Sequence, residues 1–186
     1  MTVTEISTQE LTYYKFHEYN FYIDAQNVHK SLQYYHQRTI DWGRFMVYCK
    51  ERFQATQVKI FFGYVQKYQT LYNSLRSYGY EICFKETLIL PDGTIKWNVD
   101  IDIAIVAVRD FYEWNATHTY LVTGDWDYNS LVDFWKEKWI FGSVLVPWIH
   151  NSSQLLSRVA QKKIIDIAPM KRKLQKENPS IATWVS

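Results

Sequence analysis

Four aspartates carry the chemistry that this sequence suggests. They are Asp24 in FYIDAQN, Asp100 in KWNVDID, and Asp125 with Asp127 in TGDWDY. Each follows or borders an apolar segment, so a parallel α/β sheet could gather them into one cleft. Carboxylates gathered in one cleft repel each other, and a bound divalent cation relieves that repulsion. Oxygen ligands of this kind suit Mg²⁺ or Mn²⁺, which can activate a water and stabilise the leaving oxygen in phosphodiester hydrolysis.

Each of these aspartates also has a plain structural explanation. Aspartate is common at helix N-caps and strand ends, so any one of the four alone is better explained as a cap than as a metal ligand. Their joint occurrence at the ends of apolar segments favours the metal site.

The elements that must position the acids follow from apolar runs and turn signals. A polar loop is expected after the first strand, with His29 on its surface, and the strongest turn signal spans residues 90–94. The alternation of elements predicts a three-layer α/β/α fold with an open, mostly parallel central sheet. We predict strands at residues 19–23, 58–65, 80–84, 118–122, 141–146 and 164–167, and helices at residues 40–53, 69–78, 131–138 and 152–160.

The segment at residues 99–108 (VDIDIAIVAV) fits two structures. Its alternation and branched residues favour a strand, whereas its alanines share an apolar helical face with their neighbours. We predict a helix, because a parallel sheet needs a crossover between the strands at 80–84 and 118–122. Asp100 then falls in the first turn, where its charge suits the helix dipole.

Three motifs in the chain resemble the NYN domain family. FYIDAQN resembles the family's opening of a hydrophobic strand, Asp, two variable residues and Asn. KWNVDIDIAI resembles its Lys, Val-Asp and apolar helix, and LVTGDWDYNSLV is similar to its Ser/Thr-Gly-Asp-x-Asp-Phe/Tyr-x-x-Leu signature. The Ser-Ser pair at 152–153 and the run KIIDI at 163–167 are similar to its closing elements, so the resemblance spans about residues 20–167.

The resemblance implies a PIN-like nuclease fold and a preference for RNA. It places the metal-binding and catalytic acids at Asp24, Asp100, Asp125 and Asp127, and we expect single-stranded RNA as the substrate. The family often has a further acid two turns into the helix after Val-Asp, but residues 105–107 are Ile, Val and Ala. This departure leaves the acid for a second metal unassigned. Asp102 could substitute if the segment were a strand, where it would share the face of Asp100, but on a helix it would point to a different face.

Other polar residues near these motifs could contact the substrate or support the acids. Asn27 and Thr123 are expected to steady the substrate or the metal ligands, and Lys96 could reach a phosphate. Ser152 and Ser153 could donate hydrogen bonds to a phosphate at a helix N-terminus. The plain alternatives are a solvated lysine and two capping serines.

Length and composition suit one domain. We expect an N-terminal extension at residues 1–18, the nuclease domain at 19–168 and a basic tail at 169–186, in a chain of 186 residues with a net charge of +2. The start does not resemble a signal peptide, and no apolar run approaches the roughly 18 residues of a membrane span. We expect a cytoplasmic protein that has no membrane partner. The sequence is compatible with a homo-oligomer.

Two functions are compatible with these features of the sequence. The first is a metal-dependent endoribonuclease, and the alternative is a catalytically weak or inactive RNA-binding or protein-interaction module on the same fold. A phosphoaspartate phosphatase is disfavoured because Gln26 replaces the acid expected two residues after Asp24. A nucleotide-binding fold is disfavoured because no Gly-rich loop follows the first strand.

Overall fold

The computed structural model has a six-stranded parallel sheet at its centre. It describes residues 18–36, 38–89, 91–92, 95–114, 116–151, 156, 158, 160–170 and 174–177. The strand order is β4-β3-β1-β7-β8-β9, and every neighbouring pair is parallel, as predicted. The strands are β1 (Glu18–Asp24), β3 (Gln57–Gly63), β4 (Glu81–Lys85), β7 (Ala116–Val122), β8 (Phe141–Val146) and β9 (Ile164–Asp166).

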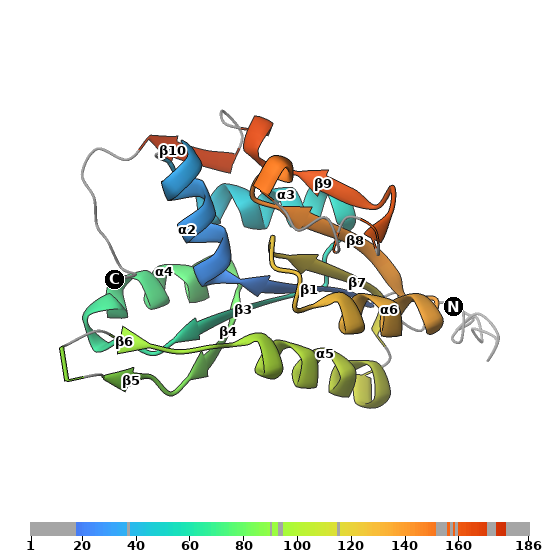
Figure 1. The fold of residues 1–186 in the computed structure, drawn as a ribbon, viewed down its shortest axis with the longest axis horizontal. Helices are drawn as coiled ribbons and strands as arrows, with labels where there is room; N and C mark the ends of the chain where they lie inside the picture. Colours follow the sequence, from blue (N-terminus) through green and yellow to red (C-terminus); the bar gives the residue numbers. More distant parts are fainter. Residues whose placement is uncertain are drawn as a thin grey trace, which may run out of the picture.

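Helices cover both faces of this sheet and complete the predicted three-layer fold (Figure 1). Successive residues of β1 enter different cores, because side chains alternate along a strand. Phe21 and Ile23 join the core under one set of helices, and Tyr22 joins the core that contains the fully buried Trp135. The first set is α2 (Ala25–His36), α3 (Trp42–Phe53) and α4 (Gln69–Tyr78), and the second is α5 (Asp100–Trp114) and α6 (Asn129–Glu137).

The order of the strands creates a switch point between β1 and β7. The chain builds outward from β1 through β3 to β4, and α5 then carries it back to β7 on the other side of β1. The predicted helix at 99–108 is therefore confirmed as a crossover. The connections after β1 and β7 lead away in opposite directions, and open α/β sheets bind ligands at the carboxyl ends of strands at such a point. Asp24 is the last residue of β1, so the topology places it at this switch point.

The loop predicted after the first strand is wrong, because these residues form α2. Val28 and Leu32, four residues apart, are both fully buried, so a narrow stripe of this polar helix packs into the core. His29, expected on a surface loop, is only 1% exposed. The Oδ1 atom of Asp24 accepts a hydrogen bond from the Asn27 N–H at 3.0 Å, which satisfies a free donor in the first turn.

Shorter elements complete the fold. The two-residue strands β5 (Leu88–Ile89) and β6 (Ile95–Lys96) pair antiparallel on either side of the predicted turn, and β2 (Arg38–Ile40) pairs antiparallel with β10 (Gln175–Glu177). Most of the helix predicted at 152–160 lies outside the described residues. The described helices include none with the length and apolarity that a membrane crossing requires. The 3-10 turns are η1 (Gln66–Tyr68), η2 (Ile149–Asn151) and η3 (Ala168–Met170).

Candidate functional site

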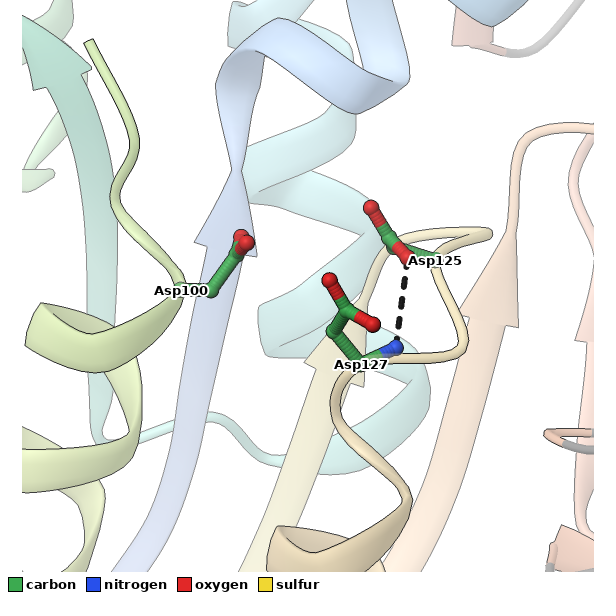
Figure 2. Close-up of side chains that lie close together, drawn as sticks. All are labelled: Asp100, Asp125 and Asp127. Atoms are coloured by element: carbon green, nitrogen blue, oxygen red, sulfur yellow. Dashed lines mark hydrogen bonds between the residues drawn. The ribbon is translucent and has the colours of Figure 1, made fainter.

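Three carboxylates converge at the carboxyl end of the sheet. One carboxylate oxygen from each of Asp100, Asp125 and Asp127 lies within 4.8 Å of the other two, and we call these residues the acid trio. Figure 2 shows their side chains around a common space, Asp100 from the start of α5 and the other two from the loop between β7 and α6. Asp100 and Asp125 are half-buried and Asp127 is exposed, so the trio is accessible from solvent.

Asp24 lies beside the trio but outside that set of close oxygens. Its side chain is buried, and its Oδ2 atom lies 3.4 Å from the hydroxyl of Tyr128. Burial, together with the negative charges of Asp100 and Asp125, raises the pKa of Asp24 to about 6, although the hydrogen bond from Asn27 opposes this rise. Asp24 therefore takes up a proton at mildly acidic pH.

Tyr128 connects Asp24 to the trio, and the sequence predictions did not include it as a site residue. Tyr128 is only 2% exposed. Its hydroxyl donates a hydrogen bond of 2.8 Å to Asp100 Oδ1. Burial, followed by the charges of Asp24 and Asp100, raises the pKa of the phenol, so the hydroxyl remains a donor. A signal was present in the sequence, because the motif TGDWDY ends in this aromatic residue.

Asn27 and Thr123 hold the loop that carries two members of the trio. The Asn27 side-chain oxygen accepts a hydrogen bond of 2.8 Å from the Gly124 N–H. The fully buried Thr123 accepts one of 3.2 Å from the Asp125 N–H, and Asp125 in turn accepts one of 3.2 Å from the Asp127 N–H, drawn in Figure 2. These contacts place both residues behind the acids, where they support the loop.

The start of α5 fixes the remaining member of the trio. The Asn98 side chain accepts a hydrogen bond of 2.7 Å from the Asp100 N–H, and this bond satisfies a free donor in the first turn of α5. One residue earlier, the Trp97 ring covers Gly63 at the end of β3, where an added Cβ would lie only 2.2 Å from Trp97 Cδ2. A glycine at position 63 is therefore what allows the segment before Asp100 to lie against the sheet.

The other predicted site residues stay apart from the trio or are not described. The side chain of Lys96 and both Ser152 and Ser153 lie outside the described part of the chain. Asp102 points away from the trio and forms an ion pair of 2.9 Å with Lys85, as expected for a helix.

The electrostatics of the trio fit a divalent cation. Within the described ranges, no lysine or arginine forms an ion pair with Asp100, Asp125 or Asp127. Partial desolvation, followed by the negative charges of Asp125 and Asp100, raises the pKa of Asp127. Several carboxylate oxygens around one space are the ligands that Mg²⁺ and Mn²⁺ prefer. The trio can therefore hold one such ion.

Comparison with known proteins identifies the family to which the chain belongs. No curated protein matches the chain. A crystal structure of a protein of unknown function from Vibrio parahaemolyticus is similar in fold, with a TM-score of 0.70 and 21% identity over 81% of this chain and 93% of that chain. The NYN domain family matches residues 20–168, which include most of β1, all of α5 and the loop after β7. The chain therefore belongs to the NYN domain family, within the PIN-like nuclease superfamily.

Proposed function

We propose that this chain is a divalent-metal-dependent endoribonuclease that hydrolyses RNA phosphodiester bonds at the acid trio. The trio itself carries the proposal, because it gathers three carboxylates within 4.8 Å of one another, with no paired cation in the described residues. Membership of the NYN family supports the class, since the family consists generally of nucleases and its domains act on RNA.

The roles of the residues follow from their positions. Asp100, Asp125 and Asp127 each offer an oxygen ligand to Mg²⁺ or Mn²⁺. A cation bound there supplies positive charge against the scissile phosphate and acidifies a water molecule. Asp24 adds a fourth carboxylate beside the trio, and a cation bound at the trio would lower the pKa of Asp24 from about 6, because cations favour ionised carboxylates. Tyr128 holds Asp100 in place through its hydroxyl.

The proposed reaction is a hydrolysis. The oxygen of a water molecule adds to phosphorus, and the bond between phosphorus and the leaving ribose oxygen breaks. The products are one phosphate monoester and one hydroxyl end, with no other reactant required.

Cleavage of end-labelled single-stranded RNA by the purified chain tests the proposal. We expect cleavage with Mg²⁺ or Mn²⁺ and none with EDTA. The Asp125→Asn and Asp24→Asn variants should lose activity by about 100-fold or more. The Asp133→Asn variant is the matched control, because Asp133 is an exposed carboxylate of α6 beside Lys136. RNA binding without cleavage in either metal would instead support the alternative of a binding module.

A further inference from the structure

A pocket lies on the same edge of the sheet as the acid trio. It has a volume of about 420 Å³ and is lined by Tyr64, Phe84, Lys85, Glu86 and Thr87. Tyr64 directly follows β3, and Phe84 and Lys85 end β4, so the pocket lies at the carboxyl ends of these strands. Because β3 lies between β4 and β1, two strand spacings, or about 10 Å, separate the end of β4 from the end of β1.

The pocket presents two aromatic rings that are fixed by a third. Tyr64 is 43% exposed and Phe84 is 40% exposed, and their rings meet edge to face at 5.3 Å. Both rings also contact Tyr72, which is 1% exposed, with centroid distances of 6.0 Å from Tyr64 and 4.7 Å from Phe84. The Tyr72 hydroxyl accepts a hydrogen bond of 3.0 Å from the Val65 N–H. The exposed rings therefore rest on a buried and anchored one.

Two cations flank these rings. The Arg76 guanidinium carbon lies 5.7 Å from the centroid of the Phe84 ring. Lys85 lines the pocket and forms an ion pair of 2.9 Å with Asp102, in the first turn of the helix that presents Asp100. The pocket is thus connected to the trio through α5. Fixed aromatic faces beside positive charges are the combination that binds single-stranded nucleic acids, through base stacking and phosphate contacts.

We propose that Tyr64 and Phe84 form a base-stacking subsite for single-stranded RNA, with Arg76 and Lys85 near its phosphates. This inference rests on the proposed function for the identity of the ligand. Each base has a π face, so the subsite accepts any sequence. Bases in a duplex are already stacked on both sides, and the subsite therefore selects single strands. It holds the substrate on one side of the acid trio.

The test compares RNA binding by the wild-type chain and the Tyr64→Leu/Phe84→Leu double variant. Leucine keeps apolar area in the pocket but removes both π faces. The measurement is fluorescence anisotropy with a labelled oligouridine in EDTA, where metal-dependent cleavage is prevented. We expect the double variant to bind about 10-fold more weakly. Tyr112→Leu is the matched control, since Tyr112 is 65% exposed on the same helix as Asp100 but near its other end, and this variant should bind like the wild type.

An oligonucleotide of the same length without bases separates stacking from charge. The wild type should bind this abasic RNA about 10-fold more weakly than oligouridine, whereas the double variant should bind the two alike. In cleavage assays the double variant should raise KM and leave kcat unchanged, because the stack is equally strong in the ground and transition states. If the double variant unfolds early, Tyr64→Leu alone replaces it, since the contact between Phe84 and Tyr72 is then kept.

The outcomes distinguish this subsite from the ribonuclease itself. Unchanged affinity in the variants, or full discrimination against abasic RNA by the double variant, overturns the subsite even if the wild type cleaves RNA. Loss of affinity in the double variant supports the subsite even if no metal supports cleavage, a result that would count against the proposed function alone.

Discussion

Asp24 is the acid of this site whose ionisation the fold opposes most clearly. It is buried, it faces the charges of Asp100 and Asp125, and its pKa is raised to about 6. Its place at the end of β1 could be predicted, because a parallel sheet delivers strand ends to one edge. Its contact with Tyr128 could not, because residues 104 positions apart meet only in the folded chain. Local sequence shows which groups are present but not how far apart they lie.

The Asp24→Asn variant should be more stable than the wild type above pH 6 in metal-free buffer. The folded-state pKa lies above the ordinary value of 3.8, so the protonated carboxyl group stabilises the fold at low pH, and this contribution is lost as the pH rises through about 6. An amide does not ionise, so the unfolding free energy of Asp24→Asn should exceed that of the wild type by an amount that grows between pH 4 and pH 7, to on the order of 3 kcal/mol. Chemical denaturation of both proteins across this pH range measures the difference in unfolding free energy. A difference that does not change with pH would contradict the raised pKa of Asp24.

The Tyr128→Phe variant should bind Mn²⁺ about 10-fold more weakly, because Asp100 loses the hydrogen bond that orients it. The loss in unfolding free energy should be about 1 kcal/mol. Calorimetric titration and denaturation measure the two effects. Tyr80→Phe is the matched control: its buried hydroxyl donates a bond of 2.8 Å to the Trp42 carbonyl, and its loss should leave Mn²⁺ affinity unchanged. Equal Mn²⁺ affinity in Tyr128→Phe and the wild type would show that the Tyr128 hydroxyl does not contribute to the metal site.

Elements differ in how clearly the sequence predicts them. The strands β3 and β8 are largely apolar, and topology indicated α5, because the chain had to return across the sheet. The helix α2 was missed since its buried stripe is narrow and its other residues are polar. The hairpin of β5 and β6 was also missed, because strands of two residues carry too little pattern.

The contact between β3 and the start of α5 leaves no room for a side chain at Gly63. Gly63→Ala should destabilise the fold by about 1–3 kcal/mol, because the added methyl group overlaps the Trp97 ring. In a double-mutant cycle, Trp97→Leu should relieve part of this loss by opening space. Gly124→Ala is the control, since its Cβ would approach neighbouring atoms no closer than 3.5 Å. Additive effects of Gly63→Ala and Trp97→Leu would show that the ring does not cover the glycine.

The molecule as a whole is arranged so that separate parts of the chain complete one site. β1 supplies Asp24, α5 supplies Asp100, and the connection after β7 supplies Asp125 and Asp127. This assembly follows from the strand order, in which β1 and β7 are neighbours although about 90 residues separate them. The sequence predicted the parallel sheet and the convergence of acids. The sequence did not show that three of the acids form a close set, or that Asp24 lies outside this set in contact with Tyr128. Both features depend on how the side chains pack.

Calorimetric titration of Mn²⁺ into the purified chain tests whether the acid trio is a metal site. We expect one bound ion per wild-type chain, no detectable binding by Asp125→Asn, and wild-type binding by Asp133→Asn, whose carboxylate lies on the exposed side of α6. If the wild-type chain binds Mn²⁺ no more strongly than Asp125→Asn does, the acid trio is not a metal site.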